Sequence, residues 1–165
     1  MYEVSTRGMP ERALLCLKRN VAEDKAWAFG KEFIALLRHH QLPQVPGRAG
    51  AFFCIYWGEV SEDSDGPLEW CRPVPPDEAE ALAARCPELS LHAEPAHQEA
   101  FVTLGDGQID GAEWQLVERS LHAWSEHQPD VHPIDLGLRF TYLPGEAAQG
   151  TYSDVAVPFA ARARG

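Results

Sequence analysis

Apolar residues in the first half of the chain predict a strand followed by a helix. The stretch at 13–21 is rich in leucine, as expected for a strand with a buried face. After it, Phe29, Phe33, Leu36 and Leu37 are spaced i, i+4, i+7 and i+8, which places them on one side of a helix. The pattern therefore indicates a helix whose apolar side packs on a sheet.

The same order of elements recurs in the second half. A strand-like run at 99–105 precedes Val117, Leu121 and Trp124, whose spacing again predicts a helix with one apolar side. Each half thus reads as β-α-β-β with mostly antiparallel strands. The two strands expected after each helix, joined by an acidic, glycine-containing turn, lie at 51–57 and 67–74 and at 133–142 and 152–159.

Matching residues about 85 positions apart indicate that the two halves are related. The matches at this offset include Ser5 with Ser90, Pro10 with Pro95, and Glu69 with Asp154. We therefore predict an α+β fold in which two pseudo-symmetric β-α-β-β modules, a tandem repeat, form a single domain with a ligand groove between them. The expected boundaries are 1–165 for the domain, 1–75 for module 1, 76–87 for a linker helix and 88–165 for module 2.

Side chains alternate along a strand, so one set of positions in each strand pair faces away from the helix. In module 1, alternation places Leu68 and Trp70 toward the helix, and the offset of 85 transfers the other positions from module 2. The predicted ligand-binding residues are those that face away: Phe52, Tyr56, Glu69, Cys71, Asp135, Arg139, Tyr152 and Asp154.

Aromatic rings and carboxylates predominate in this set. A cleft lined by both suits a flat molecule that is cationic or forms hydrogen bonds, since ring faces and desolvated carboxylates attract cations. The role of Arg139 has two interpretations, because its guanidinium could neutralise Asp135 or hold an anionic part of a ligand. A half-solvated antiparallel sheet with one polar face remains the simpler reading of any single position.

The charge balance narrows the class of partner. The chain of 165 residues has a formal net charge of -11, which argues against nucleic acid because phosphate contacts need clustered lysine and arginine. No apolar run approaches the roughly 18 residues of a membrane-spanning helix. The N-terminal residues lack a signal-peptide pattern. We expect a cytoplasmic protein that contacts neither nucleic acid nor membrane.

Cysteine and histidine give no sequence evidence for a metal centre. The four cysteines, Cys16, Cys54, Cys71 and Cys86, form no CxxC pair, and there is no HExxH motif. Strand-like surroundings suggest reduced, buried thiols. We expect no structural zinc site, no other metal and no cofactor.

Longer stretches of the chain resemble a known family. The duplicated modules closing with "SDVAVPF", together with "YWGEVSEDSDGPLEWCRPV" and "AEPAHQEAFVTLG", resemble the GyrI-like small-molecule-binding domain. That domain occurs alone and as the effector-binding half of MerR- and AraC-type regulators, including BmrR-like multidrug sensors. The similarity is greatest to C-terminal effector domains of actinobacterial MerR-type regulators.

The resemblance implies roles for particular residues. Family members hold a ligand in the groove between modules, and an acidic residue of the second module contacts cationic aromatic drugs. That position corresponds here to Asp135, while Tyr152 matches an aromatic that often lines the pocket. Glu69 matches a glutamate that recurs in the subfamily with the "DGP-x-E" pattern. The chain has no helix-turn-helix, so a stand-alone binding protein and the effector half of a longer DNA-binding regulator are both expected possibilities.

Three functions follow, in order of preference. The first is a multidrug-type binding domain that captures planar aromatic, cationic or amphipathic compounds for sensing or sequestration. The alternative is a hydrolase of strained electrophilic natural products, in which Glu69 would be the general base. The third is a protein-binding inhibitor whose acidic excess mimics nucleic acid. The identity of the ligand, its chemical fate and the oligomeric state stay open at this point.

Overall fold

The computed structural model describes residues 2–104, 111–134, 136–143 and 152–161, and the chain divides into two compact units. We call Glu11–Pro95 the central unit. We call Met1–Pro10 together with Ala96–Gly165 the terminal unit. Each unit combines helices with antiparallel strands, so the predicted α+β class is confirmed.

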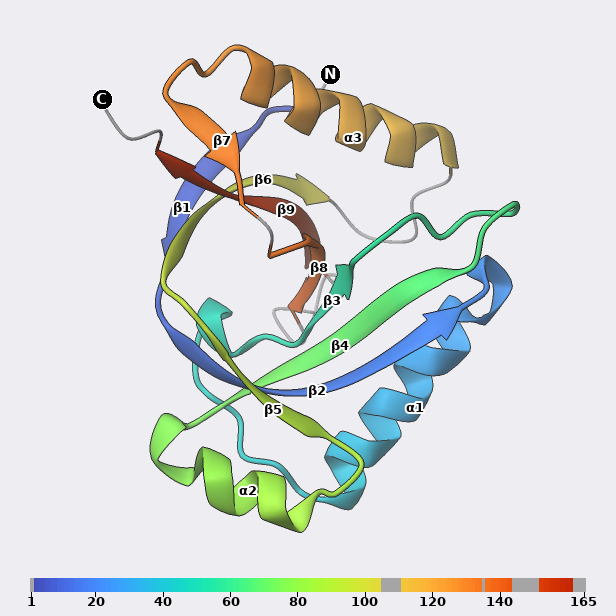
Figure 1. Cartoon of the computed structure of the whole chain (residues 1–165), viewed down its shortest axis with the longest axis vertical. Coiled ribbons are helices and arrows are strands. Elements are labelled where there is room, and N and C mark those ends of the chain that lie inside the picture. The colour runs from blue at the N-terminus through green and yellow to red at the C-terminus, as the bar shows by residue number, and fades with distance from the viewer. Residues whose placement is uncertain (1, 105–110, 135, 144–151, 162–165) are drawn as a thin grey trace. The chain divides into compact units, whose positions relative to one another are not determined.

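The central unit contains four strands in the order β5-β2-β4-β3, each antiparallel to its neighbours (Figure 1). Helix α1 packs on β2 and β4, and α2 packs on β2 and β5. A 3₁₀ turn at Pro76–Glu78 precedes α2, within the range expected for the linker helix. The elements are β2 (Arg12–Val21), α1 (Ala26–His39), β3 (Phe53–Tyr56), β4 (Gly66–Val74), α2 (Ala79–Arg85) and β5 (Ser90–Glu94).

The face of this sheet that α1 covers is built around Trp70. The Trp70 ring stacks on Phe33 of α1 with centroids 6.1 Å apart, and both side chains are buried. Gly30 of α1 allows this close approach, because a Cβ at Gly30 would lie 2.8 Å from the Trp70 ring. The predicted orientation of Leu68 and Trp70 toward the helix is therefore confirmed.

The terminal unit has the strand order β1-β6-β9-β8, with β7 paired to the far end of β9 (Figure 1). Its apolar core joins Val117 and Leu121 of α3 to Val102 and Val155 of the sheet. The elements are β1 (Ser5–Met9), β6 (His97–Leu104), α3 (Gly111–Glu126), β7 (Val131–Pro133), β8 (Leu138–Leu143) and β9 (Tyr152–Ala161).

The boundaries of the units differ from those of the predicted modules. Strand β1, expected in module 1, pairs with β6, and β5, expected in module 2, pairs with β2. The physical reason is that β4 and β5 occupy both edges of β2, which leaves no edge there for β1. At an offset of 85, β1 coincides with β5 and β2 starts where β6 starts. The tandem repeat itself stays a prediction.

One aromatic lies outside the core that its spacing suggests. Trp27 precedes the apolar residues of α1 by less than a turn, but 51% of its surface is exposed, and the Lys31 ammonium lies 6.0 Å from its ring. Trp114, at a similar position in α3, instead stacks on Phe140 with centroids 5.1 Å apart. Across the described residues, no helix combines the length and apolarity needed to cross a bilayer.

Candidate functional site

Glu69 lies at the middle of β4, on the face of the central sheet opposite Trp70. Paired residues of neighbouring strands share a face. Lys18 on β2 and Ile55 on β3 are the partners of Glu69, while Cys16 and Phe53 are the partners of Cys71. We call this surface the Glu69 face. Its residues include Cys16, Lys18, Phe53, Ile55, Glu69 and Cys71.

The Glu69 carboxylate is nearly buried and has neutral or exposed neighbours. Trp57 donates its indole N–H to Glu69 Oε1 at 3.1 Å, and His92 Nε2 lies 3.7 Å from Oε2. The Glu69 side chain is 10% exposed and that of His92 is 55% exposed. Lys18 holds its ammonium 5.1 Å from the Trp57 ring. In the part of the chain that the structure describes, no lysine or arginine lies within ion-pair distance of this carboxylate.

Two thiols lie beside Glu69. Cys16 and Cys71 face each other across β2 and β4 with their sulfurs 3.3 Å apart, and both are buried. Cys16 Sγ, a Glu69 carboxylate oxygen and a His92 ring nitrogen all lie within 4.8 Å of one another. All four cysteines of the chain are buried and none forms a disulfide, in agreement with the sequence prediction.

The other charges of the Glu69 face neutralise one another. Arg12 on β2 forms a buried ion pair at 2.5 Å with Glu94 on β5. The Arg12 guanidinium also lies 4.6 Å from the centroid of the Phe53 ring. Cys54, on the opposite face, has a raised thiol pKa because of burial and, further, because of the nearby Glu69 charge.

The predicted orientation of Phe52 and Tyr56 is wrong. Tyr56 pairs with Leu68, which puts Tyr56 on the helix side, and the Phe52 ring lies 6.0 Å from Trp70. The pairing register explains the error. Cys71 and Ala156 are 85 residues apart, but their partners Phe53 and Arg139 are 86 apart, and a shift of one residue turns every side chain to the other face.

In the terminal unit, Asp154 is fully buried and held by an arginine. Arg7 donates to both Asp154 oxygens, at 2.9 and 3.1 Å, and to Glu99 at 2.8 Å. His97 is 3.0 Å from the other Glu99 oxygen. Burial alone would raise the pKa of Glu99, but the His97 hydrogen bond and the charges of Arg7 and Arg139 outweigh it and lower the pKa to about 2. This cluster is a closed, charge-balanced network.

The remaining predicted residues of the terminal unit contribute less. Arg139 shares the face of Asp154, is 1% exposed, and donates to the backbone carbonyls of Leu136 and Gly137. Asp135 lies outside the described residues, as does the side chain of Tyr152, whose backbone begins β9. The structure therefore brings Glu69 together with Cys71, and Asp154 together with Arg139.

Residues that the sequence reasoning missed complete both clusters. Trp57 and His92 contact Glu69, whereas Arg7 and Glu99 surround Asp154. A signal was available, because Arg7 and His92 are 85 residues apart, as are Asp154 and Glu69. Corresponding carboxylates thus have corresponding neighbours, a buried guanidinium in one unit and an exposed imidazole in the other.

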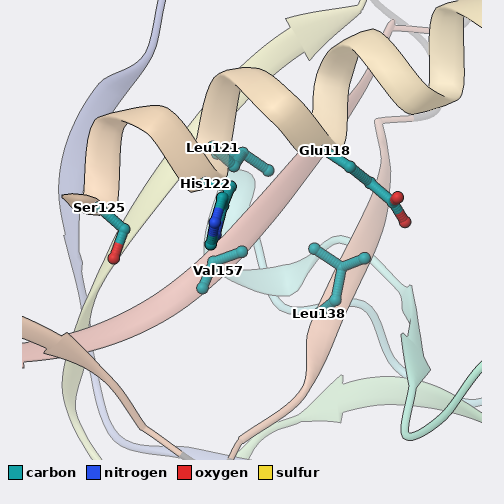
Figure 2. A pocket seen from close by; sticks show the side chains of 6 residues that line it. All are labelled: Glu118, Leu121, His122, Ser125, Leu138 and Val157. Atoms are coloured by element: carbon teal, nitrogen blue, oxygen red, sulfur yellow. The ribbon is translucent and has the colours of Figure 1, made fainter.

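A separate cavity lies between α3 and the terminal sheet. It has a volume of about 200 Å³, and Figure 2 shows it lined by side chains of α3, β8 and β9. Pockets for drug-sized ligands usually have ~300–1,000 Å³. None of the predicted ligand-binding residues is among the lining residues, which are Glu118, Leu121, His122, Ser125, Leu138 and Val157.

Comparisons with known proteins identify the fold. No family model matches the sequence, and no curated protein does either. Solved structures do match. The C-terminal domain of EcmrR is 14% identical with a TM-score of 0.68, covering 97% of this chain and 98% of that domain. A hydrolase from Listeria innocua is 10% identical with a TM-score of 0.62, covering 96% of this chain and 92% of that one.

A third structure adds a ligand. SAV2435 bound to tetraphenylphosphonium is 14% identical with a TM-score of 0.60, covering 96% of this chain and 94% of that one. At these identities the likeness concerns the fold, and it agrees with the resemblance read from the sequence. The chain has the fold of the GyrI-like small-molecule-binding domain, the effector-domain fold of MerR-type regulators.

Proposed function

We propose that this chain is a small-molecule-binding domain that captures aromatic cations through Glu69. One observation carries the proposal: the Glu69 carboxylate is 10% exposed, yet its neighbours are an indole N–H and an exposed imidazole rather than a lysine or arginine among the described residues. A carboxylate removed from water is costly unless a cation compensates it. An external cation supplies that compensation.

The corresponding position in the terminal unit supports this interpretation. There Arg7 binds Asp154 with two hydrogen bonds and lies 4.1 Å from the centroid of the Phe101 ring. The protein's own cation therefore occupies the place beside that carboxylate and ring. At Glu69 the adjacent ring belongs to Trp57, the residue type whose face attracts cations most strongly. The similarity in fold to SAV2435, which binds tetraphenylphosphonium, supports the same ligand class.

Tetraphenylphosphonium is the probe for the first test. We expect calorimetric titration of the full chain to show micromolar binding, and Glu69→Gln to weaken it about tenfold, as the loss of one ion-pair contribution of about 1.4 kcal/mol requires. Tetraphenylborate, an anion of nearly the same shape, should bind far more weakly than the cation. Glu80→Gln, on exposed Glu80 of α2, gives the same change in net charge and should leave the affinity unaltered.

Two outcomes would contradict the proposal. Equal affinity for the cation and the anion would show that shape and apolarity, not the carboxylate, determine binding. Equal loss in Glu69→Gln and Glu80→Gln would show that only the net charge matters. The assignment of the ligand to a groove between modules, and of roles to Asp135 and Tyr152, stays a prediction.

A hydrolase that uses Glu69 as general base is the second candidate. The fold similarity to the hydrolase from Listeria innocua favours it, as does the low exposure of the carboxylate, a setting in which glutamates act as bases. Incubation with an aryl epoxide would reveal it as formation of the diol, detected by mass spectrometry and lost in Glu69→Gln. Binding without product supports the binding domain instead.

A further inference from the structure

We propose that Cys16, Glu69 and His92 form a binding site for Zn²⁺ in the central unit. Each residue supplies a donor type that zinc accepts in proteins, namely thiolate sulfur, carboxylate oxygen and imidazole nitrogen. The proposal concerns a different ligand from the aromatic cation and does not depend on it, although both would use Glu69. It also departs from the sequence prediction, which expected no metal site because the three residues lie far apart along the chain.

Sheet topology is what brings the three donors together. Cys16 lies on β2, Glu69 on β4 and His92 on β5, three strands that are adjacent in the order β5-β2-β4. Their donor atoms are all within 4.8 Å of one another. Zinc–ligand bonds of ~2.0–2.3 Å place tetrahedral donors roughly 3.3–3.8 Å apart. A contraction of at most about 1 Å therefore closes the site, which side-chain rotation can supply.

Burial and charge suit a dication. Cys16 is 2% exposed and the Glu69 side chain 10%, whereas His92 is 55% exposed, so a metal reaches the site from the His92 side. One thiolate and one carboxylate neutralise the two charges of the ion. The Trp57 indole N–H on Glu69 holds the carboxylate, as outer-shell partners of zinc ligands do. Three protein ligands leave one position of the tetrahedron for water.

The terminal unit provides an internal comparison. At an offset of 85, Cys16, Glu69 and His92 correspond to Phe101, Asp154 and Arg7. Two of the three donors are absent there, and the Arg7 guanidinium lies between the carboxylate and the ring. A cation thus stands at this place in one unit as part of the chain. In the other unit the residues at the same place are metal ligands.

The test uses the reduced, metal-free full chain titrated with Zn²⁺ against a chromophoric chelator. We expect one zinc per chain, with binding weakened about 100-fold or more in His92→Ala, since loss of a ligand exceeds the 10–100-fold cost of losing an outer-shell partner. His122→Ala removes a histidine that is 76% exposed on α3 and should leave the zinc affinity unchanged. Substitution with Co²⁺ should give a thiolate charge-transfer band that Cys16→Ser abolishes.

Because His92 is exposed on β5, His92→Ala is expected to fold, so the outcome remains interpretable if Cys16→Ser does not. Zinc binding that is undetectable, or unchanged in His92→Ala, overturns the proposal. A Co²⁺ spectrum without the thiolate band does so as well. The two proposals separate cleanly: Trp57→Leu should weaken tetraphenylphosphonium binding while zinc binding persists, and His92→Ala should have the opposite effect.

Discussion

Arg7 is the cation around which the buried charges of the terminal unit are arranged. It links Asp154 and Glu99, which are 0% and 1% exposed, into one network with His97. Removing one partner of such a network leaves an uncompensated buried charge, at a cost of about 3–5 kcal/mol. The corresponding histidine of the central unit makes no such commitment to Glu69.

The lowered pKa of Glu99 predicts a defined dependence of stability on pH. A carboxyl group with a pKa near 4.5 when unfolded and about 2 when folded stabilises the protein fully above pH 4.5 and loses that effect as the pH falls toward 2. The shift corresponds to about 3 kcal/mol. Urea unfolding of wild type between pH 6 and pH 2 should show this loss, and Glu99→Gln should flatten the profile.

Glu118→Gln, on the exposed side of α3, is the matched control and should keep the wild-type profile. If Glu99→Gln and wild type lose stability in parallel between pH 4.5 and pH 2, then Glu99 is not the group responsible.

Side-chain alternation predicted the orientation of Glu69 but could not identify its neighbours. Alternation acts within one strand, so it correctly opposed Glu69 to Trp70. Trp57 was missed because its phase was transferred from the other half at an offset of 85, and the two β3-type strands differ by one residue. His92 was missed because its contact with Glu69 depends on strand order, which local patterns do not contain.

At the scale of elements, the packing of α1 on its sheet depends on one glycine. Gly30 faces Trp70 directly, and any side chain there meets the indole ring at 2.8 Å. Helix propensity alone favours alanine over glycine by about 1 kcal/mol. The contact must therefore override propensity at this position.

Gly30→Ala consequently should destabilise the protein, by about 1–3 kcal/mol, because the buried Trp70 ring has no room to move away. The reverse exchange at exposed Ala35 of the same helix, Ala35→Gly, should cost about 1 kcal/mol through propensity alone. Thermal denaturation of both variants tests this. A higher midpoint for Gly30→Ala would show that propensity prevails over the contact.

The β-α-β-β order of each half could be predicted because it rests on local periodicity. Both helices and most strands lie where apolar spacing indicated them. The pairing of β1 and β5 could not, because neighbours in sequence usually pair and nothing local signals the exception. Each of these short strands instead adds to the sheet of the other unit, beside β6 and β2 respectively.

At the scale of the whole molecule, the central unit is continuous in sequence and the terminal unit is not. A fragment of residues 11–95 contains every strand of the sheet that carries Glu69. We expect it to fold alone, with cooperative thermal unfolding by circular dichroism. A fragment of residues 1–87 lacks β5 and should not unfold cooperatively. Cooperative unfolding of the 1–87 fragment alone would contradict this division.

The discontinuity of the terminal unit also sets an order of events during protein synthesis. Strand β1 is among the first segments to leave the ribosome, yet its partner β6 begins only at His97. At ~5–20 residues per second, several seconds pass before that partner emerges. The central unit can form during this interval, while β1 waits as an unpaired edge strand. The first strand to be translated is thus among the last to be incorporated.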